Sequence, residues 1–129
     1  MKITGMDHLV LTCASIERTV AFYAGVLGMR AETFDDGRQA LHFGDQKFNL
    51  HRAGHEFEPK AQAPTPGSVD ICLVSATPLT EVVTALRAGH VEIIEGPVSR
   101  TGARGPMRSV YLRDPDGNLV EIASYGEPR

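Results

Sequence analysis

Four side chains of types that bind metal ions lie within strand-like runs of this sequence. These are His8 in DHLVLT (7–12), His51 in KFNLHRA (47–53), Asp70 in VDICLV (69–74) and Glu121 in NLVEIAS (118–124). Residues alternate in these runs, and every second side chain of a strand points to the same face. Buried imidazoles and carboxylates cost free energy unless a partner neutralises them. A divalent metal ion would be such a partner.

The same order of elements occurs twice around these residues. A strand at 7–12, a helix at 16–28 and strands at 29–34, 38–44 and 47–53 are followed by a strand at 69–74, a helix at 78–89 and strands at 91–96, 108–114 and 118–124. We predict an α+β fold of two β-α-β-β-β repeats, residues 5–53 and 68–125. A Pro- and Glu-rich linker over 54–67 joins them within one domain of residues 1–129.

Helix ends and turns are marked by particular residues. Ser15 and Thr77 are expected N-caps, with Pro78 at the first helical position of the second helix. Gly28 and Gly89 are expected to end the two helices. Turns are expected at DDG (35–37) and DPDGN (114–118), with a positive φ at Gly117.

A β-α-β-β-β unit can curl into a half barrel with its helix on the convex face. Alternation then places one set of apolar residues beneath the helices: Leu9, Leu11, Phe48, Leu50, Ile71, Leu73, Val110, Leu112, Val120 and Ile122. The concave face receives the other set: His8, Val10, Thr12, Asn49, His51, Asp70, Cys72, Ser109, Tyr111, Leu119, Glu121 and Ala123.

Composition excludes several classes of function. The chain has 129 residues, 13 basic against 16 acidic, and a formal net charge of −3, which argues against a nucleic-acid partner. No apolar run approaches the roughly 20 residues of a membrane span, and no signal peptide is expected at the N-terminus. Two cysteines without CxxC spacing do not form a disulfide framework. We therefore expect a cytoplasmic protein.

The motifs resemble those of the vicinal-oxygen-chelate superfamily, which includes glyoxalase I, extradiol dioxygenases and bleomycin-resistance proteins. The resemblance rests on DHLVLT, AFYAGVLGMR (21–30) and DPDGNLVEI (114–122), and it covers essentially the whole chain. Residues 48–73 and 96–122 are more closely similar to small lactoylglutathione-lyase-like proteins of the glyoxalase domain-containing protein 5 type.

The resemblance implies a metal site with ligands on the first and last strand of each repeat. His8 and Glu121 match the first and last of these positions. Asp70 stands where the family often has His, and the remaining position falls at Asn49 or His51. Mixed nitrogen and oxygen ligands favour Mn, Fe, Co, Ni or Zn over Ca.

Catalysis in this superfamily follows from two adjacent substrate oxygens bound to the metal. A carboxylate, Asp70 or Glu121, would move the proton, and Asp70 could instead be a ligand or orient His8. Tyr111 could donate a hydrogen bond or act as an acid.

The segment 99–109 carries three arginines among glycine and proline residues. We expect a mobile basic loop in which Arg100, Arg104 and Arg108 bind an anionic small-molecule substrate, with Asn49 as a further contact. A solvated hairpin loop is the alternative.

Three functions follow from the resemblance. A metal-dependent lyase or isomerase is the first, an extradiol-type ring-cleavage dioxygenase the second, and a metal-free drug-binding protein the third. Asp70 in place of the family's His argues against the dioxygenase, and His8 with Glu121 argues against the metal-free protein. Small members of the superfamily are often dimers, so a homodimer is expected.

Overall fold

The computed structural model describes residues 1–126, so the last three residues of the expected domain lie outside the described part. The chain divides into two compact units, Met1–Gly67 (unit 1) and a second unit that begins at Ser68 (unit 2). Each unit contains one four-stranded mixed sheet and one helical segment, so the predicted α+β fold of two β-α-β-β-β repeats is confirmed. Neither helical segment of residues 1–126 has the length and apolar character needed to cross a bilayer.

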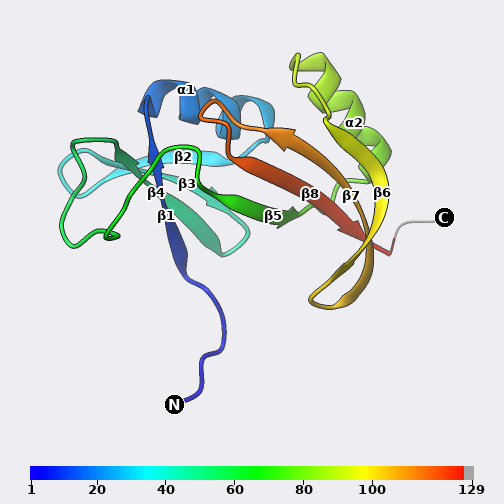
Figure 1. Cartoon of the computed structure of the whole chain (residues 1–129), viewed down its shortest axis with the longest axis horizontal. Coiled ribbons are helices and arrows are strands. Elements are labelled where there is room, and N and C mark those ends of the chain that lie inside the picture. The colour runs from blue at the N-terminus through cyan, green and yellow to red at the C-terminus, as the bar shows by residue number, and fades with distance from the viewer. Residues whose placement is uncertain (127–129) are drawn as a thin grey trace. The chain divides into compact units, whose positions relative to one another are not determined.

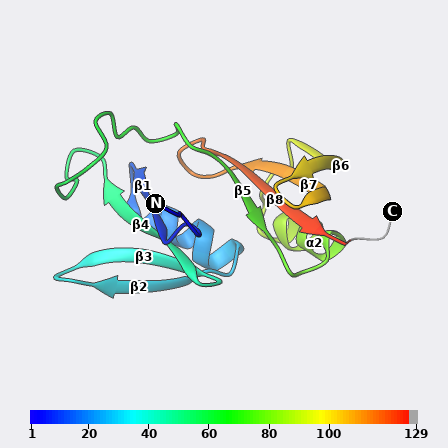
Figure 2. The same cartoon turned by 90° about the horizontal axis from the view of Figure 1, so that it is seen from below.

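Unit 1 contains β1 (His8–Cys13), α1 (Ile16–Val20), η1 (Ala21–Val26), β2 (Arg30–Phe34), β3 (Arg38–Phe43) and β4 (Gln46–Arg52). Its sheet, sheet A, has the order β1-β4-β3-β2, with β1 parallel to β4 and the other neighbours antiparallel (Figure 2). The segment 54–67 forms turns and bends.

Unit 2 contains β5 (Asp70–Val74), α2 (Leu79–Ala88), β6 (Glu95–Gly102), β7 (Gly105–Arg113) and β8 (Leu119–Tyr125). Its sheet, sheet B, has the order β5-β8-β7-β6, which repeats the topology of sheet A with β5 parallel to β8.

In each unit the helical segment lies over one face of its own sheet (Figure 1). The rings of Tyr23 in η1 and Phe48 in β4 meet edge-on, with their centroids 5.6 Å apart. Leu11 and Leu50 are also buried in unit 1, as are Val110, Leu112, Val120 and Ile122 in unit 2. Leu9, Ile71 and Leu73 are only half-buried because β1 and β5 are edge strands.

The first helix changes its geometry part-way along. The Ser15 hydroxyl accepts a hydrogen bond from the Arg18 amide, so the predicted N-cap is confirmed. From Ala21 the turns widen into a π-helix, and the Leu27 amide donates to the Phe22 carbonyl five residues back. Gly28 follows with φ +79°, as its expected place at the helix end requires.

Several predicted limits in unit 2 are wrong. The strand expected at 91–96 spans Glu95–Gly102, and the strand expected at 108–114 begins at Gly105. The N-cap of α2 is Pro78 rather than Thr77, because Pro78 retains an extended ψ of 142°. The expected loop at 99–109 is a β-hairpin in which Gly102 pairs with Gly105, so only Ala103 and Arg104 form the turn. Gly105 has φ +119°, a backbone conformation that glycine adopts without the steric cost of a side chain. Arg100 and Arg108 therefore lie on the paired strands of this hairpin, and Arg104 lies in its turn, as the alternative of a hairpin loop implied.

Candidate functional site

His8 begins β1 and has an oriented imidazole. Its Nδ1 atom lies 2.8 Å from Asp7 Oδ1, and 43% of its side chain is exposed. This hydrogen bond, followed by the charge of His8, lowers the pKa of Asp7 below 3.8, so the carboxylate is ionised and can only accept. Nδ1 therefore donates, and a neutral imidazole keeps its lone pair at Nε2. A carboxylate that holds a histidine in this way is typical of metal-binding histidines.

His8 and His51 share a face of sheet A but lie far apart on it. Parallel pairing sets His8 beside Lys47 and Thr12 beside His51. Lys47 and His51 are four residues apart on β4, which corresponds to about 13 Å. A metal ion holds nitrogen ligands at about 2 Å. The backbone positions of His8 and His51 are therefore widely separated for two ligands of one ion, and their membership of one ligand set stays a prediction.

Asn49 lies between these two positions on β4, paired with Val10. Asn49 and His51 are 6% and 2% exposed. Within residues 1–126, neither Asn49 Oδ1 nor His51 Nε2 has a hydrogen-bond partner, which is uncommon for buried polar atoms. Burial, and then the charge of Arg38, lowers the pKa of His51 below 6.5, so its imidazole is neutral at pH 7.

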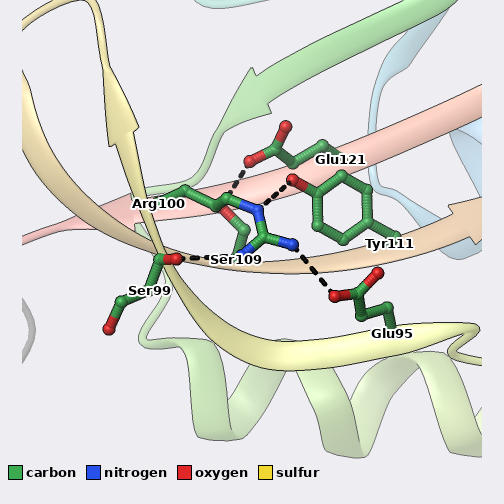
Figure 3. A network of polar contacts seen from close by, with 6 residues as sticks. All are labelled: Glu95, Ser99, Arg100, Ser109, Tyr111 and Glu121. Carbon is green, nitrogen blue, oxygen red and sulfur yellow. Dashed lines mark hydrogen bonds and ion pairs between the residues drawn. The ribbon is translucent and has the colours of Figure 1, made fainter.

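In unit 2, Glu121 stands at the centre of a polar face (Figure 3). Strand pairing places Cys72 and Tyr111 on either side of it. The Ser109 hydroxyl donates to Glu121 Oε2 at 2.5 Å. Figure 3 draws no contact of the other carboxylate oxygen, Oε1, with the residues that it shows.

Cys72 is affected by the same carboxylate. Although the residue is exposed, partial desolvation of its thiol raises the pKa to about 11, and the charge of Glu121 and a hydrogen bond to it contribute further. Asp70, two residues earlier on β5, is exposed and pairs with Leu119. Alternation therefore puts Asp70 on the same face as Cys72 and Glu121.

A second cluster of polar side chains connects β6 to β7. Arg100 Nε donates to the Tyr111 hydroxyl at 2.9 Å, and Arg100 Nη2 donates to Glu95 Oε2 at 2.9 Å (Figure 3). No sequence pattern indicates a role for Glu95 or Ser109, although alternation predicts Ser109 on this face. The role of Glu95 depends on the pairing of β6 with β7, which no local pattern shows.

The three arginines do not converge on one ligand. Arg108 donates to Ser99 Oγ at 3.3 Å, and its pairing with Ser99 places it on the face opposite to Arg100. The Arg104 guanidinium lies 4.3 Å from the centroid of the Tyr125 ring at the hairpin tip. The expected anion-binding group of Arg100, Arg104 and Arg108 is therefore not formed.

A cleft of about 370 Å³ lies within unit 1. One side is formed by β1 and β4, and the other by the segment after β4. Its lining includes Val10, Thr12, His51, Pro59, Ala61 and Pro64.

A family model confirms the superfamily that the two repeats, His8 and Glu121 indicate. Residues 5–122 match the model described as the glyoxalase/bleomycin resistance protein/dioxygenase superfamily. The chain belongs to this superfamily.

Two similar proteins align with most or all of the chain. Virulence protein STM3117 of Salmonella typhimurium is 54% identical over 125 residues, which are 97% of this chain and 87% of that protein. Its crystal structure matches with a TM-score of 0.95, over 97% of this chain and 99% of the other. Glyoxalase domain-containing protein RDO1 of Mycosarcoma maydis is 46% identical over 129 residues, which are 100% of this chain and 73% of RDO1.

A more distant member shares the fold. The crystal structure of lactoylglutathione lyase from Agrobacterium tumefaciens is 20% identical, with a TM-score of 0.73 over 98% of this chain and 100% of the other. Superfamily membership raises the question of whether the residues described above could hold a metal ion.

The donor chemistry of this superfamily domain fits a divalent ion, but neither unit supplies a complete ligand set. His8 Nε2 is an available donor, and the Glu121 carboxylate, which Ser109 and Cys72 contact, is a second. Within neither unit do three His, Cys, Asp or Glu side chains of residues 1–126 form a group that could hold a metal.

Proposed function

We propose that this chain is a metal-dependent lyase or isomerase that acts on a small substrate with two adjacent oxygen atoms. The observation that supports the proposal is the pair of oriented donors, His8 held by Asp7 and Glu121 held by Ser109. They occupy the first strand of unit 1 and the last strand of unit 2, where the superfamily resemblance expects ligands.

The donors that we propose for a Mn, Fe, Co, Ni or Zn ion are His8, Glu121 and Asp70, as the superfamily resemblance implies. The two nearby hydrogen bonds reduce the conformational entropy lost on binding, because each ligand already has a fixed orientation. When bound, the metal supplies a Lewis acid that stabilises negative charge on the substrate oxygens.

Side chains of this chain would carry out the proton transfer of the proposed reaction. If the substrate oxygens complete the coordination, Asp70 stays outside it, and its exposed carboxylate oxygens can accept a proton from a substrate carbon. The Tyr111 hydroxyl has the opposite role. Because it accepts the Arg100 hydrogen bond, its own proton can be donated to a substrate oxygen.

Metal content tests the proposal directly. Protein purified without chelators or a His-tag is analysed by elemental mass spectrometry, together with His8→Ala and Glu121→Ala. We expect close to one ion per chain in the parent protein and loss of the ion in both variants, with unchanged circular dichroism. His55→Ala is the matched control, because His55 is exposed and lies outside the strands. Tight metal binding by both site variants would contradict the proposal.

The element found selects the reaction to assay. Ni or Zn directs the assay to hemithioacetals, and Mn to epoxide- or phosphonate-type substrates. Fe directs it to catechols, and catechol cleavage under O₂ would replace the lyase by the ring-cleavage dioxygenase.

A metal-free binding protein is the second candidate function. The cleft in unit 1 favours it, since most of the residues that line the cleft are apolar. Protein that contains no metal and takes none up from added divalent ions would support this candidate over the enzyme.

We further propose that the chain forms a homodimer, as small members of the superfamily often do. Light scattering should give twice the chain mass of 14.0 kDa. A mass equal to that of one chain would contradict the dimer.

A further inference from the structure

The segment 54–67 covers one end of the polar face of sheet A. Alternation along β4 places His51 on the face opposite to Phe48, and the Phe48 ring packs against the helical segment. His51 is nevertheless only 2% exposed. The segment lies on its side of the sheet, because the Phe57 ring contacts the His51 ring with the centroids 5.7 Å apart. Within unit 1, the segment is therefore the cover of His51.

This cover contacts the sheet through exposed or half-buried side chains. None of its residues is buried, and most are exposed. The aromatic contact with His51 is made by Phe57, which is itself 42% exposed. The centroid of the Phe57 ring also lies 4.7 Å from the guanidinium carbon of Arg38, at the start of β3. Segments with so little buried surface open locally at a fraction of the free energy of global unfolding.

Hydrogen bonds and ion pairs within the segment hold its first half together. The Gly54 amide donates to Glu56 Oε2 at 2.7 Å, and Lys60 Nζ lies 3.5 Å from a carboxylate oxygen of both Glu56 and Glu58. The segment begins and ends at glycines with positive φ, +83° at Gly54 and +82° at Gly67. Glycine adopts a wide range of φ without the steric cost of a side chain. Rotation at these two ends can therefore move the segment as one body.

The covered position leaves a polar atom unsatisfied. His51 Nε2 is buried and has no hydrogen-bond partner within residues 1–126. Such an atom destabilises the covered position, because it has lost water without gaining another partner. Movement of the segment away from the sheet breaks the contacts of Phe57 and returns the His51 ring to water. The two positions therefore differ by a small number of opposing contributions.

We propose that residues 54–67 form a lid over sheet A and that Phe57 is its latch. In the closed position the latch packs against His51 and Arg38, and in the open position His51 is in contact with water. A ligand or an ion can reach His51 only after the lid opens. The proposal concerns the chain by itself, so it holds for either candidate function and is tested without metal or ligand.

Chemical modification of His51 measures the opening. Diethyl pyrocarbonate reacts with neutral imidazoles, and a tryptic digest then places His51 in the peptide 48–52 and the exposed His55 in the peptide 53–60. In the native full-length protein at about pH 7, we expect His51 to react about 10–100-fold more slowly than His55. Urea below the unfolding transition should leave this rate nearly unchanged, since opening of a lid exposes little surface.

Two results of this experiment would overturn the proposal. A rate at His51 equal to that at His55 would mean that the segment does not cover the ring. A rate that rises with urea as steeply as global unfolding would mean that His51 reacts only in the unfolded protein.

Two aromatic residues that contact Arg38 provide a test of the latch. Phe57→Ala should increase the rate of His51 modification about tenfold, because it removes an aromatic contact and a cation–π contact. Phe34→Ala is the matched control, since the Phe34 ring centroid lies 5.5 Å from the same guanidinium carbon but Phe34 belongs to β2. It should leave the rate unchanged, and circular dichroism checks that both variants are folded. An unchanged rate in Phe57→Ala, or equal acceleration by both variants, would contradict a latch at Phe57.

Cleavage at Lys60 distinguishes release of the lid from simple loss of the Phe57 side chain. A protease binds several residues of its substrate in an extended conformation, so trypsin should cut after Lys60 only when this part of the lid has left the sheet. Limited proteolysis at Lys60 should be about tenfold faster in Phe57→Ala than in the parent protein and unchanged in Phe34→Ala. Faster modification of His51 without faster cleavage at Lys60 would mean that the variant only uncovers the ring, and the lid would be refuted.

Discussion

Arg100 and Tyr111 are joined by a hydrogen bond of 2.9 Å from the guanidinium Nε to the phenolic oxygen. The guanidinium also lies 5.3 Å from the centroid of the Tyr111 ring. The same side chain donates to Glu95, and these contacts raise the pKa of Arg100 above its usual range. Arg100 is therefore part of the hairpin structure, and its charge already has a carboxylate partner.

Tyr111→Phe should lower the thermal midpoint by about 2–4 °C, because it removes one hydrogen bond and keeps the ring. Arg100→Lys should lower it by a similar amount, since lysine has no equivalent of Nε. The double variant should lose little more than either single variant, because both changes remove the same bond. Fully additive losses in calorimetry would show that the two residues stabilise the hairpin independently.

Asn118 connects the turn before β8 to the start of β5. Its side-chain amide donates to Asp114 Oδ2 at 2.7 Å, and its Oδ1 accepts from the Val69 amide at 2.8 Å. Asn118→Ala should reduce the free energy of unfolding by about 2–4 kcal/mol, because it leaves buried partners unsatisfied. Urea denaturation measures this loss.

Asn49→Ala is the matched control for Asn118→Ala. Asn49 is also buried, but its Oδ1 has no partner within residues 1–126. Its loss should therefore reduce the free energy of unfolding by clearly less. Equal losses would mean that side-chain packing, and not the hydrogen bonds of Asn118, stabilises this region.

Alternation along the strands was sufficient to predict which side chains share a face. It placed His8 and His51 together on sheet A, and Ser109, Tyr111 and Glu121 together on sheet B. The positions of glycine residues predicted the end of the first helix at Gly28 and the positive φ at Gly117. These features depend on local backbone geometry, which the types of neighbouring residues largely determine.

Features that depend on pairing between distant strands could not be predicted in this way. A period of two gives the face of a strand but not the register with its neighbour, so Asn49 and His51 could not be separated as candidate ligands. The register of β1 with β4 pairs Asn49 with Val10 and His51 with Thr12, and both residues stay candidates. Pro97, Pro106 and three glycines lie between residues 95 and 113 and do not favour a strand there, whereas the long-range pairing of β6 with β7 makes a hairpin.

The stability of unit 1 should depend on pH through His51. Burial and Arg38 lower the pKa of His51 below 6.5 in the folded protein, despite the opposing charges of Glu56 and Glu58. Between the folded and unfolded pKa values, the unfolded chain binds more protons than the folded protein. The free energy of unfolding should therefore fall as the pH drops below 6.5, and this contribution should level off below the folded-state pKa.

Urea denaturation at about pH 7.5 and about pH 5 measures this dependence. His51→Leu should lose less stability between the two pH values than the parent protein, and His55→Leu should behave like the parent. An unchanged pH dependence in His51→Leu would assign the effect to other groups.

Cys72 should react slowly with alkylating agents because of its environment. Burial and Glu121 raise the pKa of its thiol from 9.0 to about 11. Only the thiolate reacts, so iodoacetamide at about pH 8 should modify Cys72 in metal-free protein about 100-fold more slowly than an ordinary cysteine. Cys13 is fully buried, and mass spectrometry of the labelled peptides separates the two sites.

Glu121→Gln should speed the modification of Cys72, because it removes a negative charge that opposes thiolate formation. The rate should stay below that of an ordinary cysteine, since burial is the larger cause of the raised pKa. Asp70→Asn removes a carboxylate from the same face but not one that shifts the thiol, so it should leave the rate unchanged. Equal acceleration by both variants would mean that the net charge of the face, and not the contact with Glu121, controls the thiol.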